Sequence, residues 1–127
     1  MKKQQFSNQI FNTICSLVPF ISRIFDNNIC IAICEGDTCI FDLQTEAIQM
    51  PVKTGDKAIP EVIDVYKTGK PLFIIAPKEL VGVECKVYSY PIFDENGKSI
   101  GSITVSISLE KRDNLLNCIN ELTESFS

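Results

Sequence analysis

Residues 82 to 109 read GVECKVYSYPIFDENGKSIGSITVSISL, and this stretch decides the fold. Residues 84–93 and 99–108 are rich in β-branched and aromatic side chains, which is typical of strands. Between them lies Asn96-Gly97, a pair that supplies the positive φ of a tight hairpin turn. The stretch therefore predicts a long β-hairpin. Because two strands alone are marginally stable in water, we expect further strands and helices to cover its apolar face.

The composition is typical of one soluble domain. Of the 127 residues, 45% are hydrophobic, which is enough to build a core. A formal net charge of −4, with Lys and Arg scattered along the chain, argues against nucleic acid or an anionic membrane as partner. No run approaches the roughly 18 apolar residues that span a bilayer. Histidine is absent, which removes the commonest general base, and we expect no enzyme.

The chain has six cysteines, an even number that raises the question of a secreted disulfide scaffold. Their proportion is below that of disulfide-dense small proteins, and most of them stand in apolar runs, where free cysteine behaves as a small hydrophobic residue. The N-terminal residues also lack the continuous apolar core of a signal peptide. These features favour a reducing, cytoplasmic location.

Residues 6–25 predict an amphipathic helix with a wide apolar face. Two interpretations stay open: both apolar stripes enter one core, or one stripe packs on the sheet and the other on the same helix of a second subunit. Pro19 is expected to kink or split this helix. The first stripe consists of Ile10, Ile14, Leu17, Ile21 and Ile24, and the second of Phe11, Cys15, Val18 and Phe25.

Residues 29–35 and 38–43 predict a second hairpin around Gly36-Asp37. If these two residues are the centre of the turn, Glu35 faces Thr38 and Cys34 faces Cys39. The alternation of strand side chains then predicts that four residues share one face of the sheet: Cys30, Cys34, Cys39 and Phe41.

The remaining segments complete an α+β pattern. A helix is predicted from Pro60 to a stop at Gly69, and a strand over residues 72–76 that ends at Pro77. Residues 109–126 predict a terminal helix with a narrow apolar seam. We expect this helix to continue into a further module or to pair with the same helix of a second copy of the chain. The seam consists of Leu115, Ile119, Leu122 and Phe126.

Five short segments recur in one order in a known kind of sensor. They read VKTGD at 52–56, YKTGKP at 66–71, PKELVGV at 77–83, YPIFDENGKSIG at 90–101 and SLEK at 108–111. On these segments the chain resembles the PAS-like sensor module at the front of soluble, cytoplasmic methyl-accepting chemotaxis proteins of Firmicutes. The resemblance covers roughly residues 29–112 and is carried mostly by turn chemistry in a compatible order.

The resemblance implies an α+β, PAS/GAF-like fold: a five-stranded antiparallel sheet with helices on one side and flanking N- and C-terminal helices. It divides the chain into an N-terminal amphipathic helix (1–27), a sensor core (28–108) and a signalling helix (109–127). The implied function is sensory input to chemotaxis, with a small-molecule ligand, a homodimer formed through the terminal helices, and a downstream signalling module or histidine kinase complex as partners.

Hydroxyl and aromatic side chains in the central hairpin suggest where a ligand would bind. Small hydroxyls interleaved with aromatics suit a pocket for a small polar ligand, whereas the alternative is a solvent-exposed sheet face. Lys78 would stand at the mouth of the pocket or simply be a solvated loop lysine. The candidate ligand-binding residues are Phe41, Lys78, Cys85, Tyr88, Tyr90, Ser102, Thr104 and Ser106.

The cysteines of the first hairpin suggest a different chemistry. Cys30, Cys34 and Cys39, with Cys85 in the same sheet, would hold a soft metal or an iron–sulfur cluster, or Cys34 and Cys39 would form a redox-sensitive disulfide. Ordinary core packing is the alternative, because buried cysteine is common in cores. The sequence leaves the cofactor and the ligand open.

Overall fold

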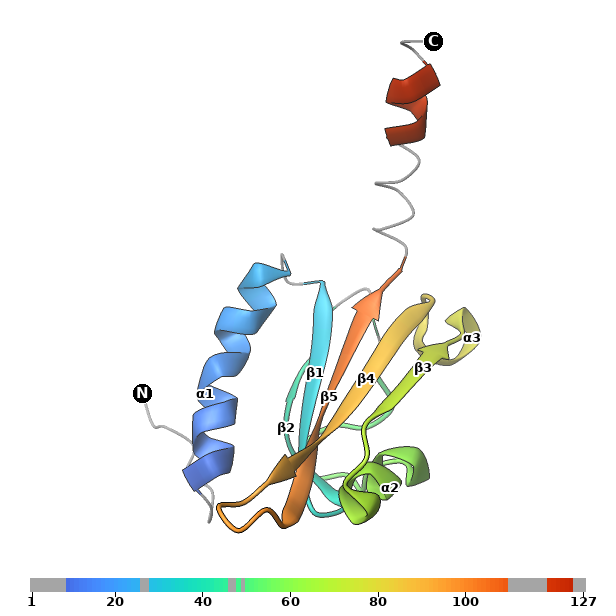
Figure 1. Ribbon diagram of the computed structural model, residues 1–127. Coiled ribbons are helices and arrows are strands. Elements are labelled where there is room, and N and C mark those ends of the chain that lie inside the picture. The colour runs from blue at the N-terminus through green and yellow to red at the C-terminus, as the bar shows by residue number, and fades with distance from the viewer. Residues whose placement is uncertain (1–8, 26–27, 46–47, 49, 110–118, 125–127) are drawn as a thin grey trace.

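A five-stranded antiparallel sheet forms the centre of the structure (Figure 1), a computed structural model that describes residues 9–25, 28–45, 48, 50–109 and 119–124. The order of the strands across the sheet is β2-β1-β5-β4-β3. The last strand of the chain, β5, is therefore the central strand and lies next to the first strand, β1. All five predicted strands are confirmed: β1 (Ile29–Glu35), β2 (Thr38–Leu43), β3 (Leu72–Ala76), β4 (Cys85–Phe93) and β5 (Ser99–Ser108).

The predicted central hairpin consists of β4 and β5. Its turn is held by Asp94, whose Oδ1 accepts hydrogen bonds from the backbone N–H of Asn96 and of Lys98, both at 2.9 Å. Gly97 has a φ of 80°, the positive value for which glycine was expected at this place. The turn chemistry in the sequence therefore fixed this hairpin locally.

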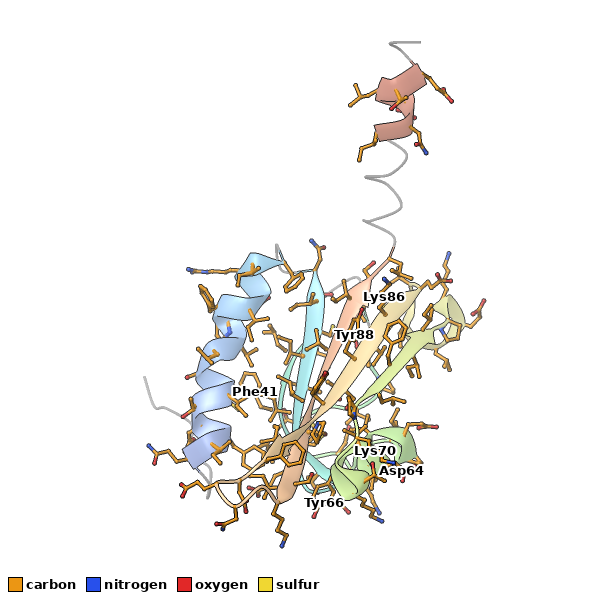
Figure 2. All side chains as sticks on the ribbon, viewed as in Figure 1. Phe41, Asp64, Tyr66, Lys70, Lys86 and Tyr88 are labelled. Atoms are coloured by element: carbon orange, nitrogen blue, oxygen red, sulfur yellow. The ribbon has the colours of Figure 1, made fainter. Side chains whose placement is uncertain are left out.

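The β1–β2 hairpin confirms part of the predicted register and corrects the rest. Cys34 faces Cys39 as predicted, but Ile33 faces Phe41, which leaves Ile40 as an extra residue in a β-bulge. One extra residue sends the following side chains of the strand to the opposite face. The prediction that Phe41 shares a face with the cysteines is therefore wrong. Figure 2 shows Phe41 on the side of the sheet that carries α1.

The β4–β5 hairpin contains a second bulge of the same kind. Phe93 faces Ser99, whereas Ile92 faces Gly101, so Ile100 is the extra residue. The carbonyl of Ile100 accepts a hydrogen bond of 2.9 Å from the N–H of Gly36, in the turn of the other hairpin. The two hairpin turns are thus tied together at the same end of the sheet.

Helix α1 (Gln9–Ile24) packs on one face of the sheet and is not split by Pro19, contrary to that part of the expectation. Phe11 and Val18 are buried in a cluster with the isoleucines of β1. Three apolar side chains of the same helix remain exposed: Leu17, Phe20 and Ile24. The interpretation in which both stripes enter one core is therefore wrong for Leu17 and Ile24, whereas residues 6–8 of the predicted helix lie outside the described part.

Helices α2 (Pro60–Thr68) and α3 (Lys78–Val81) pack on the opposite face. Helix α2 begins at Pro60 and ends at Gly69, as predicted. Gly69 has a φ of 70° and its N–H donates to the carbonyl of Val65, which closes the last turn. Val62 and Val65 are the buried residues of α2 and lie over the sheet.

Residues 119–124 are helical, which agrees with the predicted terminal helix over the part that the structure describes. Ile119 and Leu122 are exposed there, and the other seam residues, Leu115 and Phe126, lie outside the described residues. Within the described ranges, no helix has the length and the apolar character that crossing a membrane requires.

Candidate functional site

The two faces of the sheet differ in chemistry. The α1 face is lined by large apolar residues, among them Ile29, Ile31 and Ile33. The other face, which we call the α2 face, carries small thiol, hydroxyl and methyl side chains close to the backbone. Its buried or half-buried residues in β1, β4 and β5 are Cys30, Ala32, Cys34, Cys85, Val87, Ser89, Ser102, Thr104 and Ser106.

A partly enclosed cavity of about 60 Å³ lies between the α2 face and the segment that carries α2. On the sheet side it is lined by residues that include the small Ala32 and Thr104. The lining is almost wholly apolar and contains no charged side chain. It consists of Ala32, Cys34, Met50, Pro51, Val52, Ala58, Ile59, Val62, Leu72, Ile74, Val87 and Thr104.

The floor of the cavity holds a buried pair of hydroxyls. Ser89 Oγ and Thr104 Oγ1 lie 3.0 Å apart on neighbouring strands, and both residues are buried. Next to them, Ser106 Oγ donates to the sulfur of Met50 at 3.5 Å. Met50 and Thr104 also line a smaller adjoining cavity of about 10 Å³, so Met50 lies beside both spaces.

The rim of the cavity is held by Asp42 of β2. Its Oδ1 accepts hydrogen bonds from the backbone N–H of Thr54, at 2.8 Å, and from the Thr54 hydroxyl. The Gln44 amide donates to its Oδ2 at 3.0 Å. Burial acts to raise the pKa of Asp42, but the hydrogen bonds from Thr54 and Gln44 outweigh it and hold that pKa below its usual value. Asp42 thereby fastens the predicted loop at 52–56 to the sheet.

Of the predicted hydroxyl and aromatic group, only the hydroxyls lie on the α2 face. Thr104 lines both cavities and Ser106 the smaller one, whereas Ser102 is buried beneath them. Tyr88 faces Val105 and Tyr90 faces Ile103, which places both tyrosines on the α1 face, half exposed. The prediction that the tyrosines join the hydroxyls in one pocket is therefore wrong. The alternative, that the hydroxyls lie on a solvent-exposed face of the sheet, is also wrong, because they are buried.

The other predicted ligand residues also lie away from the cavity. The Tyr88 ring stacks at 4.9 Å from that of Phe73 on the outer surface of β3 and β4, where Figure 2 shows Tyr88 beside Lys86. Lys78 is exposed at the start of α3 and lines neither cavity. Cys85 is fully buried in a cluster with Cys30 and Val83, and burial raises the pKa of its thiol to about 11.

The cysteines do not form a common metal site. Cys30 and Cys34 are four residues apart on one strand, which separates them by about 13 Å at 3.3 Å per residue. Among the described residues, which include four cysteines of the sheet, no group of three His, Cys, Asp or Glu side chains comes together. The metal or cluster hypothesis for Cys30, Cys34 and Cys39 is wrong for that reason. Cys34 and Cys39 remain a facing pair.

Several residues that line the cavity were not predicted from the sequence, chiefly Ala32, Met50, Val62 and Ile74. The alternation of β1 does place Ala32 on the face of Cys30 and Cys34, so its small size was a usable signal. Met50 lies in an irregular segment, and no periodic pattern identifies it.

A second hollow, of about 390 Å³, is open to solvent at the end of the sheet where the hairpin turns meet. Polar groups dominate its surface, and Tyr66 of α2, labelled in Figure 2, lies at its side. Because it is more open to water, it offers a ligand less burial than the cavity under α2 does. It is lined by Phe11, Glu35, Gly36, Tyr66, Lys98, Ser99 and Ile100.

Comparisons with known proteins give one informative similarity. No family model matches the chain. The chain is 24% identical over 120 residues to YfmS of Bacillus subtilis (strain 168), a protein described as a sensory transducer. The match covers 93% of this chain and 41% of that relative, so the chain spans about two fifths of the length of the protein it resembles.

Proposed function

We propose that the chain is a sensory input domain of a chemotaxis signal transducer, a PAS-like module that binds a small molecule between its sheet and α2. The observation that carries the proposal is the similarity to a sensory transducer along 93% of the chain. The five-stranded antiparallel sheet and the apolar cavity between it and α2 support the same proposal. The module is non-enzymatic and cytoplasmic in this proposal.

The lining of the cavity indicates the class of ligand. An apolar wall with no charged side chain favours a small neutral, largely apolar molecule, and Thr104 is the hydroxyl residue of the lining. The 60 Å³ of the cavity has room for about four to six water-sized groups at 10–15 Å³ each. A larger ligand requires α2, or the segment of residues 50–59 before it, to move outward.

A ligand in this cavity has a short route to the end of the domain. Thr104 belongs to β5, which lies at the centre of the sheet and ends at Ser108. Beyond it, Leu109 N–H donates to the carbonyl of Glu84 at 2.9 Å. A ligand that binds one packing of α2 more tightly shifts the population towards that packing. The terminal helices, paired in a homodimer, then pass the change to a downstream signalling module such as a histidine kinase complex.

The test measures thermal stabilisation by small neutral compounds. Xenon and a series of short linear alcohols are added to the purified chain, and the unfolding temperature is recorded. We expect a saturable rise with at least one of them, because a ligand that binds only the folded state stabilises it. Ala32→Leu fills the cavity and is expected to abolish the rise. Phe73→Ala changes a residue on the opposite face and serves as the control, in which we expect the same rise in the unfolding temperature.

The outcomes separate this proposal from its alternatives. If the compound still raises the unfolding temperature of Ala32→Leu, it binds outside the cavity. If it no longer raises that of Phe73→Ala, binding in the cavity is contradicted. Native mass spectrometry of the freshly purified protein adds a second measurement, since a retained ligand adds a defined mass.

A ligand-free dimerisation module is the second candidate, which the exposed Leu17, Phe20 and Ile24 of α1 favour. For that function we expect a dimer without any added mass and no compound that raises the unfolding temperature.

A further inference from the structure

The facing pair Cys34 and Cys39 has the backbone geometry of a cross-strand disulfide. The backbone of Cys39 points away from β1: its N–H donates to the carbonyl of Asp56 and its carbonyl accepts from the N–H of Gly55, both at 2.8 Å. The two cysteines are therefore a non-hydrogen-bonded pair, whose Cα atoms lie about 4.5 Å apart in an antiparallel sheet. That separation falls within the range of about 4.4 to 6.8 Å found in disulfides.

The other described cysteines are too far away to compete. Cys30 lies on the same strand as Cys34 at about 13 Å. Cys85 lies on β4, which is separated from β1 by β5. Cys15 belongs to α1, on the opposite face of the sheet. Each of the five described cysteines is a free thiol, so the pair starts in the reduced form.

Only a small oxidant can reach the two thiols. Cys34 and Cys39 are 2% and 1% exposed, which excludes bulky reagents. Cys34 nevertheless lines the cavity of about 60 Å³, which has room for a molecule the size of hydrogen peroxide. Cys39 is not part of the lining, but its sulfur is hydrogen-bonded to that of Cys34, so peroxide approaches Cys39 past the Cys34 side chain. A protein disulfide or a large organic oxidant would have no path to either sulfur.

The two thiols differ in acidity. The hydrogen bond between them, together with burial, raises the pKa of Cys34, and the same hydrogen bond lowers the pKa of Cys39. Cys39 is therefore the thiol that loses its proton first, and the thiolate is the form that attacks a peroxide. As a neutral thiol, Cys39 Sγ lies 3.5 Å from the carbonyl oxygen of Phe41.

We propose that Cys34 and Cys39 are a redox-modified site that hydrogen peroxide converts into a disulfide in the wall of the cavity. The Cys39 thiolate attacks one peroxide oxygen: an S–O bond forms, the O–O bond breaks, and the departing hydroxide takes up a proton as water. Cys34 then attacks the sulfur of the sulfenic acid. The S–S bond forms, the S–O bond breaks, and the hydroxide leaves as water with the proton of Cys34. Two thiols are oxidised and one peroxide is reduced to two waters.

This modification would change the loop that borders the cavity. The backbone of Cys39 is bonded to Gly55 and Asp56, and Thr38 forms a bridge with Lys57. A shift of Cys39 towards Cys34 therefore acts on the loop of residues 53–57 directly. The site is independent of the proposed ligand, and either proposal can fail without the other.

The experiment treats the fully reduced chain with hydrogen peroxide and determines its intact mass and its disulfide map. We expect the loss of two hydrogen masses and their return on addition of dithiothreitol. Cleavage after Arg23 and after Glu35 separates Cys34 from both Cys15 and Cys39. In the Cys30→Ala variant, a linked pair of these peptides then identifies Cys34 and Cys39 without ambiguity. Cys39→Ala is expected to prevent the link, whereas Cys85→Ala, a matched buried cysteine, keeps it.

Three results would overturn the proposal: no mass change in the folded protein, oxygen added to one cysteine without a link, or a link between other cysteines. Thermal unfolding shows whether Cys39→Ala is folded. If that variant is unfolded, the peptide map of the Cys30→Ala protein alone decides, since that protein keeps both members of the pair.

Discussion

Ser89 Oγ and Thr104 Oγ1 lie 3.0 Å apart beneath α2, on the neighbouring strands β4 and β5. Both residues are buried, so each hydroxyl satisfies the other in a place that water does not fill freely.

The stability losses on removing the two hydroxyls are expected to be less than additive. Thr104→Val leaves the Ser89 hydroxyl without its partner and should lower the free energy of unfolding by about 1–3 kcal/mol. The double variant Ser89→Ala, Thr104→Val should be less destabilised than the sum of the single variants. Urea unfolding of the four proteins checks this as a double-mutant cycle. Additive effects would show that the two hydroxyls do not depend on each other.

Gly101 marks the closest approach between β5 and β1. A Cβ at this position would lie 2.0 Å from the carbonyl oxygen of Cys34 and 3.0 Å from the ring of Phe11. Gly101→Ala should therefore lower the free energy of unfolding by about 3 kcal/mol or more, since backbone cannot give way as a flexible side chain does.

Gly97 provides the matched control for Gly101. No atom lies within 4 Å of a Cβ built there, and only its φ of 80° opposes a side chain. Gly97→Ala should cost about 1–2 kcal/mol, from backbone strain alone. Chemical denaturation of both variants gives the comparison, and an equal loss in the two would contradict the proposed clash at Gly101.

Asp42 is expected to make the stability of the domain depend on pH. Its pKa in the folded protein lies below the usual 3.8, so the charged form favours folding. This stabilisation is complete above the usual pKa and is lost as the pH falls through the lower, folded value. Asp42→Asn should therefore be less stable than the wild type by about 1 kcal/mol at pH 7. The difference should vanish in acid below the folded pKa.

Glu95, exposed in the β4–β5 turn, is the control for Asp42. Urea unfolding at pH 7 and in acid is measured for Asp42→Asn and Glu95→Gln. If Asp42→Asn loses the same stability at both pH values, its charge is not what holds Thr54.

Helix α1 presents Leu17, Phe20 and Ile24 to solvent, at 50%, 63% and 60% exposure. These residues lie three and four positions apart and share one side of the helix. If the domain dimerises through this side, Ile24→Glu should yield a monomer, because it places a charge in the apolar contact. Sedimentation velocity measures the change. Leu80→Glu, an equally exposed leucine on α3, should leave the dimer intact; the reverse pattern would move the interface to α3.

Much of the fold could be predicted because its signals are local. Pro60 and Gly69 mark the two ends of α2, and Asn96-Gly97 sets the turn between β4 and β5. Each of these residues acts through its own φ or its own missing N–H, without help from distant parts of the chain. The five strands followed from their composition and from the turns between them.

The faces of two strands could not be predicted, and both errors have one cause. Without the bulge at Ile100, Tyr90 would face Ser102 and Tyr88 would face Thr104, which is the grouping that the sequence suggested. Without the bulge at Ile40, Phe41 would share the face of Cys39. Each bulge follows its turn closely and depends on contacts across the sheet, such as the bond from Gly36 N–H to the Ile100 carbonyl. Alternation within a single strand carries no information about such contacts.

Met50 lies between the two cavities, and if the domain binds a small molecule as proposed, this side chain sets the space that the ligand finds. It borders both cavities, and the one polar contact described for its side chain is the weak one to the Ser106 hydroxyl. An unbranched side chain with three rotatable bonds changes rotamer at little cost. Rotation of Met50 can join the two spaces while every strand keeps its place. Under the proposed function, the upper size limit for a ligand is therefore gradual, because a flexible side chain and not the backbone sets it.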